Sequence, residues 1–321
     1  MSTQPPLIVV AGATATGKTD LAIRLAEGLA ADGRPVAIIS ADSRQVYRGL
    51  DIGTGKPTAA ERAAVPHHLL DVVDPGERYH AARFRADARA AVAAVHARGR
   101  LPVVVGGTGL YVRALLKGLS PAPPADPALR AALEAEAQAQ GTPALHARLA
   151  ALAPEAARRL HPNDRVRIVR AIEVHAAGAA MPGPDAEGDW AAPARGWRLV
   201  MIGLRRERSA LNAAIAERAH AMVARGMMGE ARGLLAAGLD PTGPPMDGIG
   251  YRPLGLAVQG RMPMEEAVRQ LVRDTTRYAK RQMTWFAREP EIRWIDVDGA
   301  GGVEGAAETV LKHITQEGLI E

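Results

Sequence analysis

The 321-residue sequence contains no cysteine, and aromatic residues make up only 3% of it. Without cysteine the chain can form neither disulfides nor thiolate metal sites. No apolar stretch is long enough to span a membrane. The short apolar run near the N-terminus has no basic residues before it, so it does not match a secretory signal. We therefore expect a cytoplasmic protein without membrane contact.

Zinc sites built from histidine are not expected either, because the nine histidines show no zinc-ligand spacing. We interpret His67 and His68, which follow Pro66, as loop or helix-start residues rather than ligands. What the sequence does have is 47% hydrophobic residues, which indicates a globular rather than a disordered chain. Its 321 residues are enough for a full α/β core plus a second unit, so we expect one large domain with an insertion. Its net charge of +5 permits a polyanionic partner without requiring one.

The segment Gly12 to Thr19, GATATGKT, has the spacing of a phosphate-binding loop. In such loops, backbone N–H groups and the helix N-terminus face the anion. Lys18 would neutralise the phosphates, and the Thr19 hydroxyl can ligate Mg²⁺. The apolar residues before the loop and the helical pattern after it supply the required order of strand, loop and helix. A plain tight turn is the alternative, and the loop does not specify whose phosphates it binds.

Four β-branched apolar runs alternate with helical stretches, namely Leu7–Val10, Val36–Ile39, Leu101–Val105 and Leu199–Ile202. This alternation predicts an α/β fold, with a P-loop-type parallel sheet flanked by helices. Ligands of such sheets bind at the carboxyl ends of the strands. Only the second run leads to an acid there, Asp42. Its carboxylate could hold Mg²⁺, accept a proton from a nucleophile, or cap a turn.

Between about residues 121 and 193 the sequence becomes alanine-rich and helical. We predict an all-helical domain inserted at residues 119–196, with residues 181–196 as a loop, and a catalytic core formed by residues 1–118 and 197–321. After Leu204 the helical spacing of one apolar set predicts core positions. These are Leu211, Ile215, Ala219 and Met222.

A long helix is predicted from about residue 263 to residue 286. Its predicted buried stripe is Met264, Val268, Leu271, Val272, Ala279 and Met283. Arginines recur at every fourth position along an adjacent face, at Arg269, Arg273, Arg277 and Arg281. They indicate either a solvated face, with a Glu265–Arg269 pair, or a ridge that follows phosphates. The sequence favours neither interpretation.

Six motifs together decide the resemblance: GATATGKT, DSRQVYRGLDIGTGKP, PHHLLDVVDP, VGGTGLYVRALLKGL, GIGYR and AKRQMTWFAR. Their order from Gly12 to Arg288 resembles the bacterial tRNA dimethylallyltransferases, also called tRNA isopentenyltransferases. The resemblance implies transfer of a dimethylallyl group from dimethylallyl diphosphate to N6 of the adenosine immediately 3′ of the anticodon in tRNA, without ATP consumption. It also implies Mg²⁺ as cofactor, and we expect a monomer.

Roles for individual residues follow from this resemblance. The catalytic set it implies is Asp42 as general base with Thr108, Lys18 and Arg218. The implied diphosphate site is Gly12, Ala13, Thr14, Ala15, Thr16, Gly17, Lys18 and Thr19, with Thr19 on the metal. The implied tRNA contacts are Asp42, Ser43, Arg44, Gln45, Thr108, Arg130, Arg167, Arg170, Gly250, Tyr251, Arg252, Arg277, Lys280, Arg281, Gln282 and Trp285.

The chain departs from the family pattern at a few positions. Ala13 and Thr16 replace the usual proline and serine without removing a phosphate contact, whereas Val166 replaces a glutamine. His80 stands in place of a serine, and Asp247 stands where a basic residue often occurs. The acid at position 247 puts one tRNA contact in doubt.

Three rival functions stay open. A small-molecule kinase would use the same loop, Mg²⁺ and base. An adenine-nucleotide isopentenyltransferase would share the core, although a free nucleotide needs neither the inserted helices nor the basic helix. A non-catalytic RNA-binding switch that uses GTP would need a guanine-recognition segment such as Asn-Lys-x-Asp, which the sequence does not show.

Overall fold

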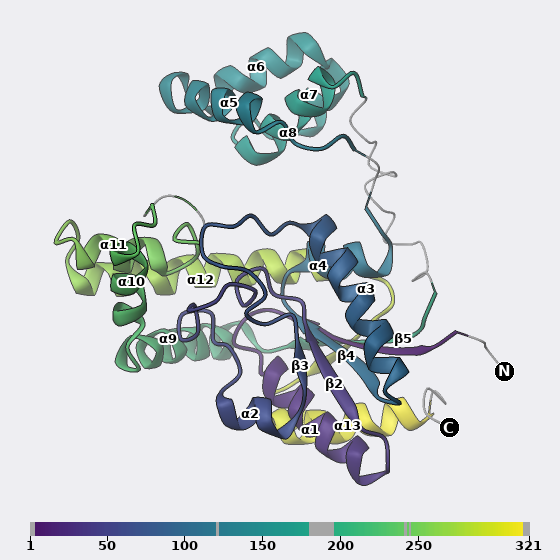
Figure 1. The fold of residues 1–321 in the computed structure, drawn as a ribbon. Helices are drawn as coiled ribbons and strands as arrows, with labels where there is room; N and C mark the ends of the chain where they lie inside the picture. The colour runs from purple at the N-terminus through teal and green to yellow at the C-terminus, as the bar shows by residue number, and fades with distance from the viewer. Residues whose placement is uncertain (1–3, 120–121, 180–195, 241–242, 244, 317–321) are drawn as a thin grey trace. The chain divides into compact units, whose positions relative to one another are not determined.

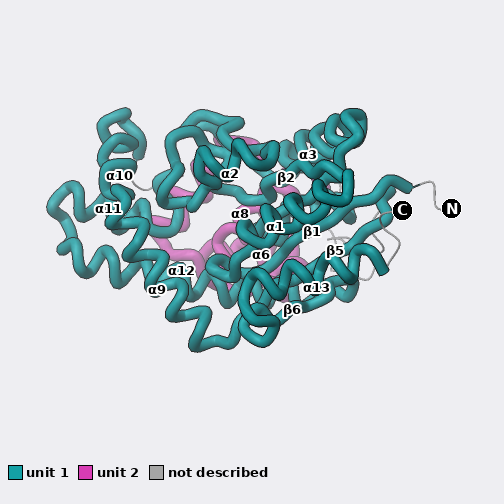
Figure 2. Tube along the Cα trace, turned by 90° about the horizontal axis from the view of Figure 1, so that it is seen from below, with its two compact units in different colours: residues 1–118, 190–321 teal, residues 119–189 magenta. Residues whose placement is uncertain are grey.

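The computed structural model describes residues 4–119, 122–179, 196–240, 243 and 245–316. The chain divides into two compact units, residues 1–118 with 190–321 and residues 119–189, which Figure 2 shows in different colours. The predicted loop at 181–196 lies almost entirely outside the described residues, so the end of the insertion stays a prediction. Each unit is described here by itself.

The larger unit is built on one sheet of six parallel strands, in the order β3-β2-β4-β1-β5-β6 (Figure 1). The strands are β1 (Pro6–Gly12), β2 (Val36–Ser40), β3 (His67–His68), β4 (Leu101–Gly106), β5 (Arg198–Arg205) and β6 (Ile292–Asp296). The four predicted runs are β1, β2, β4 and β5, so the predicted fold class is confirmed. The interpretation of His67 and His68 as loop or helix-start residues was wrong, because they pair with Ile38 and Ile39 of β2 as an edge strand.

Helices cover both faces of the sheet. Those that pack on the strands are α1 (Lys18–Ala31), α3 (Ala81–Ala97), α4 (Gly109–Leu116), the end of α12 (Met264–Phe286) and α13 (Gly302–Gln316). The other described helices of this unit are α2 (Ala59–Ala64), α9 (Arg208–Ala224), α10 (Met227–Ala236) and α11 (Tyr251–Val258). Side chains of β1 alternate between the faces, as the two-residue period of a strand requires. Ile8 and Val10 pack with α1 and α13, whereas Leu7 and Val9 pack with α3 and α4.

A third apolar cluster joins α9, α10, α11 and α12 to the segment that follows β2. Ile215, Ala219 and Met222 of α9 are buried as predicted, and Leu211 is partly buried. The long helix also begins and ends close to its predicted bounds. One position of its predicted stripe was wrong, because Met264 lies in the first turn and is 37% exposed.

Among its described residues the smaller unit contains four helices, α5 (Pro127–Gln140), α6 (Thr142–Leu152), α7 (Pro154–Arg159) and α8 (Arg165–Ala176). Its helices begin with recognisable signals, since Asp126 caps α5 by accepting the N–H groups of Ala128 and Leu129. Leu133, Leu145, Leu149 and Ile168 form the centre of its own apolar core. Within the part of the chain that the structure describes, no helix of either unit is long and apolar enough to cross a membrane.

Candidate active site

The phosphate loop connects β1 to α1, and two of its glycines are required by geometry. Gly17 has φ 90°, in the left-handed region that favours glycine. A Cβ on Gly12 would lie 2.6 Å from the backbone oxygen of Leu204, so this position admits no side chain. The Thr16 hydroxyl donates to the Ala13 carbonyl at 2.9 Å and closes the loop internally. The loop conformation leaves the start of α1 facing the cavity described below.

Lys18 is held inside this loop. Its Nζ donates a hydrogen bond to the Ala13 carbonyl at 2.5 Å. Burial, assisted by the charge of Arg218, lowers the pKa of Lys18 to about 8, while Asp42 opposes the shift. An anion bound beside Lys18 would stabilise its charged form. Burial and the neighbouring guanidinium therefore leave Lys18 suited to binding an anion.

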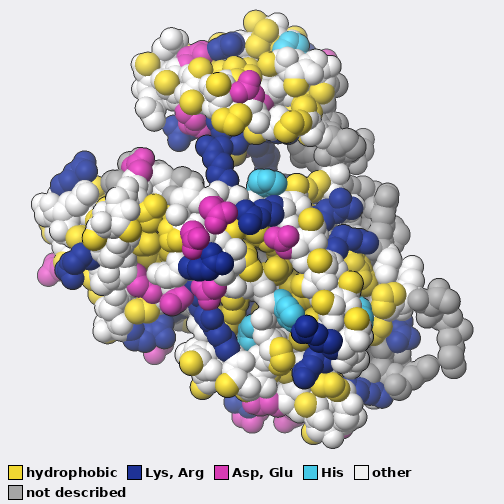
Figure 3. All heavy atoms as spheres, viewed as in Figure 1, with side chains coloured by type: hydrophobic (Ala, Val, Ile, Leu, Met, Phe, Trp, Pro, Cys, Tyr) yellow, Lys and Arg dark blue, Asp and Glu magenta, His cyan; other side chains and the backbone are white. Residues whose placement is uncertain are grey.

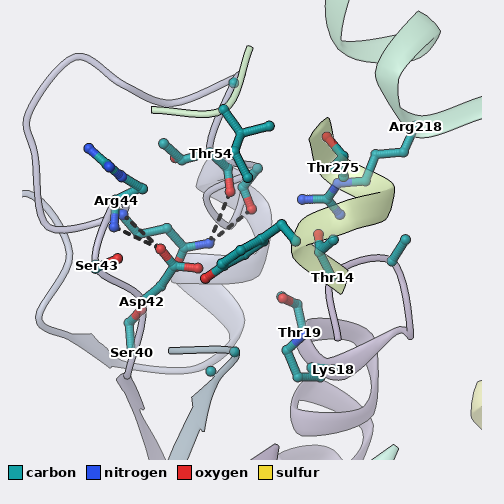
Figure 4. A pocket seen from close by; sticks show the side chains of 18 of the residues that line it. Thr14, Lys18, Thr19, Ser40, Asp42, Ser43, Arg44, Thr54, Arg218 and Thr275 are labelled. Atoms are coloured by element: carbon teal, nitrogen blue, oxygen red, sulfur yellow. Dashed lines mark hydrogen bonds between the residues drawn. The ribbon is translucent and has the colours of Figure 1, made fainter. Parts of the chain in front are cut away.

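Asp42 caps the turn that follows β2. Its Oδ1 accepts the backbone N–H groups of Arg44 at 2.8 Å and Gln45 at 3.4 Å. This is the capping role that the sequence left open, and it does not exclude a chemical one, because these bonds involve only Oδ1. In Figure 4, Asp42 lies across the cavity from Lys18 and Thr19.

Thr108 follows β4, the neighbour of β2 in the sheet. Its Oγ1 accepts the N–H of Ser43 at 3.1 Å, and its own N–H donates to the Ala41 carbonyl at 3.3 Å. Thr108 thereby ties the loop after β4 to the loop after β2. The residues that line the cavity include Ser43 but not Thr108, so in this structure Thr108 stands one side chain behind the cavity surface.

One cavity of about 420 Å³ brings these loops together. Its lining includes residues from the phosphate loop, the loops after β2 and β4, α9 and α12. Among them are Thr14, Ala15, Gly17, Lys18, Thr19, Asp42, Ser43, Arg44, Gln45, Gly107, Arg218, Tyr251, Arg281 and Gln282. It lies at the carboxyl ends of the strands, where the sheet topology predicts a ligand. A volume of this size suits a small-molecule ligand.

Arg218 enters the cavity from α9, opposite Asp42 (Figure 4). A Cβ on Gly55 would lie 1.9 Å from its Nη2, so Gly55 provides the space that the guanidinium occupies. Burial lowers the pKa of Arg218, although Asp42 and Asp20 partly oppose this. Two cations, Lys18 and Arg218, therefore face one cavity, an arrangement that favours a multiply charged anion.

The tyrosine at position 278 of α12 also lines the cavity and was missed by the sequence analysis. Burial, followed by the charge of Asp42, raises the pKa of Tyr278 to about 12, so its hydroxyl stays protonated. It lies four residues before Gln282, which places both on one face of the helix. That spacing is the signal from which Tyr278 could have been found.

Glu230 was likewise missed, and no local sequence pattern marks it. Its two carboxylate oxygens accept the N–H groups of Asp51, Ile52 and Gly53 at 2.8, 2.6 and 3.0 Å. The Tyr251 hydroxyl donates to the same carboxylate at 2.9 Å. Glu230 thus fixes the loop from which Gly53, Thr54 and Gly55 line the cavity.

The predicted contacts at 250–252 differ in exposure. Gly250 and Tyr251 are buried, and Tyr251 is engaged with Glu230, whereas Arg252 is exposed.

The departures from the family pattern at Asp247 and His80 both have partners in the structure. Arg44 donates from Nη1 to Oδ1 of Asp247 at 2.7 Å. The residue that departs from the family pattern is therefore paired with a predicted tRNA contact, and both line the cavity. His80, another departure, caps α3 by accepting the N–H of Arg83.

The arginines of α12 separate into two groups. Arg269 and Arg273 are both paired with Glu266 of the same helix, at 2.9 and 2.7 Å. Arg277 is 71% exposed and 3.5 Å from Asp274, and Arg281 lies over the Tyr278 ring. Lys280 is exposed and Trp285 is partly buried against Gly109. On the face shown in Figure 3, basic side chains of the larger unit are interleaved with acidic ones.

The three predicted contacts of the smaller unit lie on α5 and α8. Arg130 forms a two-pronged ion pair with Glu173, and Arg170 binds the same carboxylate and the Pro123 carbonyl. Arg167 is 58% exposed, beside Asp164 at 3.6 Å. Val166, which replaces the family glutamine, is 75% exposed. Arg167 is therefore more accessible than Arg130 and Arg170.

Fold and site together define an α/β phosphate-loop protein in whose cavity Lys18 and Arg218 lie opposite Asp42. The chain matches the family model described as IPP transferase over residues 45–289, and the model described as isopentenyl transferase over residues 5–71. The chain belongs to the IPP transferase family, whose members include tRNA dimethylallyltransferases.

Relatives of known name and structure cover nearly the whole chain. The tRNA dimethylallyltransferase of Anaeromyxobacter sp. (strain Fw109-5) is 52% identical over 289 residues, covering 90% of this chain and 94% of that protein. The crystal structure of the tRNA isopentenylpyrophosphate transferase from Bacillus halodurans is 37% identical, with a TM-score of 0.68 and 98% of both chains covered. The corresponding Staphylococcus epidermidis structure is 30% identical, with a TM-score of 0.70, and covers 98% of this chain and 99% of that one.

Proposed function

We propose that this protein transfers the dimethylallyl group of dimethylallyl diphosphate to the exocyclic N6 of the adenosine immediately 3′ of the anticodon in tRNA, with release of diphosphate. The observation that carries the proposal is the single cavity in which the phosphate loop faces Asp42. Names of the relatives support tRNA as the acceptor.

The donor's diphosphate fits the side of the cavity formed by the phosphate loop. Breaking the allylic C–O bond leaves the electron pair on the diphosphate, whose charge increases in the transition state. Loop N–H groups, Lys18 and Arg218 would stabilise that charge, because they line this side of the cavity. Two buried cations suit a reaction in which negative charge develops on the leaving group.

Mg²⁺ fits the same side of the cavity. Within the described residues no cluster of three or more histidine, aspartate or glutamate side chains could hold a metal ion. Mg²⁺ does not need such a cluster, because it binds through a few protein oxygens together with substrate phosphates and water. The Thr19 hydroxyl would be its protein ligand here, and the ion would supply further charge neutralisation to the leaving diphosphate.

The acceptor amine would enter from the Asp42 side. As N6 forms its new bond to the allylic carbon, its proton must leave, and we assign its acceptance to Asp42, which lines the cavity together with Asp20 and Asp247. A base within a stacked loop must first be extruded to reach such a site. Ser43, Arg44 and Gln45 line the cavity next to Asp42 and would contact the extruded nucleotide.

A transfer assay with matched acceptors tests the proposal. Purified protein, labelled dimethylallyl diphosphate and Mg²⁺ are incubated with unmodified tRNA, with AMP, or with the same tRNA carrying guanosine at the target position. We expect label only in the first tRNA, on N6 of the target adenosine. Label in AMP but not in tRNA would refute the proposal in favour of a nucleotide prenyltransferase, and ATP consumption with alcohols would favour a kinase.

A further inference from the structure

Gln282 is among the few buried polar side chains of α12, with only 5% of its surface exposed. Both ends of its amide are engaged with backbone groups distant in the sequence. Its Oε1 accepts the N–H of Thr14 at 2.9 Å, and its Nε2 donates to the Gly107 carbonyl at 2.8 Å. The side chain therefore bridges the phosphate loop and the loop after β4.

The bridge occurs where the sheet ends. The pairing of β1 with β4 runs from Ile8↔Val103 to Ala11↔Gly106, and the two chains then continue into their loops. Thr14 and Gly107 lie just beyond the last pair. An amide side chain has the same donor and acceptor as a peptide group, so Gln282 supplies between the loops the bonds that a strand would supply within the sheet.

The bridge requires glycine at position 107. A Cβ at this position would lie 2.1 Å from Nε2 of Gln282, a distance that no side-chain carbon tolerates. Alanine at 107 would therefore displace the Gln282 amide without altering residue 282. The same bridge can thus be disturbed from either side.

We infer that Gln282 is a positioning residue. It sets the distance between the phosphate loop and the loop carrying Gly107 and Thr108. It thereby also sets the distance between the diphosphate leaving group and the reacting amine. This rests on the proposed transferase function. It differs from the tRNA contact that the family resemblance implies for Gln282, because the side chain is only 5% exposed and its amide already bonds backbone groups of two loops. Transfer between two bound substrates depends on their separation, so loosening this spacing slows chemistry rather than binding.

Two variants and one matched control test the inference. Gln282→Met keeps the length of the side chain but removes both hydrogen bonds, and Gly107→Ala displaces the amide. The control is Gln270→Met on the same helix, where the amide donates to Asp274, one turn away. Single-turnover transfer at saturating dimethylallyl diphosphate and tRNA, the tRNA dissociation constant, and thermal unfolding are measured for each.

We expect both variants to lower the single-turnover rate by about 10- to 100-fold, with the tRNA dissociation constant changed by less than about threefold and the control unaffected. A weakened tRNA affinity with a normal rate at saturation would overturn the inference and make Gln282 a tRNA contact. Unchanged rates would also overturn it. If Gln282→Met does not fold, Gly107→Ala alone decides. Failure of the unmodified protein to transfer to tRNA would instead refute the proposed function.

Discussion

The ion pair between Arg44 and Asp247 lies at the cavity and makes a direct test of whether Arg44 binds RNA. The pair joins Nη1 to Oδ1 at 2.7 Å, and its side chains are 37% and 43% exposed. A tRNA phosphate that binds Arg44 must compete with this carboxylate and is also repelled by it. Asp247→Asn keeps the shape of the side chain and removes the charge. We therefore expect the variant to bind tRNA more tightly than the unmodified protein.

The size of the gain follows from the exposure of the pair. Half-exposed ion pairs stabilise by about 0–1 kcal/mol, so freeing Arg44 should tighten tRNA binding by no more than about fivefold. If Arg44 then neutralises one more phosphate, the log–log dependence of affinity on salt should steepen by about 0.7–0.9. The affinity for dimethylallyl diphosphate should not change, because neither residue belongs to the phosphate loop.

The assay is tRNA binding by filter retention over a series of salt concentrations. The matched control is Asp74→Asn, which breaks the Arg48–Asp74 pair of 2.8 Å on the same segment but outside the cavity lining. The control should leave both affinity and salt slope unchanged. Equal effects of the two substitutions, or no effect of Asp247→Asn, would refute the reasoning. In an Arg44→Ala background the Asp247→Asn gain should disappear.

Three further predictions concern the phosphate loop, the base and the basic helix. Asp42→Asn keeps the Oδ1 acceptor that caps the turn but cannot accept a proton, so single-turnover transfer should fall by about 10²–10⁴-fold without rescue by excess Mg²⁺; near-normal turnover would exclude Asp42 as base. Lys18 in the free protein has a pKa of about 8, below the ordinary lysine value, so it is charged below that pH and loses its proton above it. Diphosphate affinity should therefore fall from pH 7 to pH 9 in the unmodified protein, and Lys18→Ala should bind diphosphate weakly at both pH values and abolish transfer; retention of the pH dependence in Lys18→Ala would contradict this. Replacing Arg277 and Arg281 together by alanine should weaken binding of all tRNAs similarly and reduce the salt slope by about one to two, with transfer at saturating tRNA retained; an unchanged slope would support a solvated helix face.

Much of the fold could be predicted because it follows from hydrophobic patterns among residues that are close in the sequence. β1, β2, β4 and β5 are buried runs of β-branched residues, and α12 has a helical period. The phosphate loop is also recognisable locally, because its motif is contiguous and Gly17 takes a left-handed φ of 90°, although Gly12 is also required by its close approach to Leu204 in β5. β3 escaped prediction because it has only two residues and exists only through pairing with β2. β6 is an edge strand of five residues in which two non-buried residues separate the buried Ile292 and Ile295, so it lacks the two-residue alternation of a recognisable strand.

Only the tertiary structure decided which polar side chains meet. Gln282 has the sequence surroundings of a surface residue between Arg281 and Met283, yet it contacts Thr14 and Gly107, more than 170 positions away. The same holds for Glu230 with the loop at Asp51 to Gly53. A periodic pattern records how a segment faces the core, because that depends on neighbours along the chain. Contacts between residues far apart in the sequence leave no such pattern. The sequence by itself therefore determined four of the six strands, the phosphate loop and the family, whereas the folded chain determined which loops are joined and how the cavity is shaped.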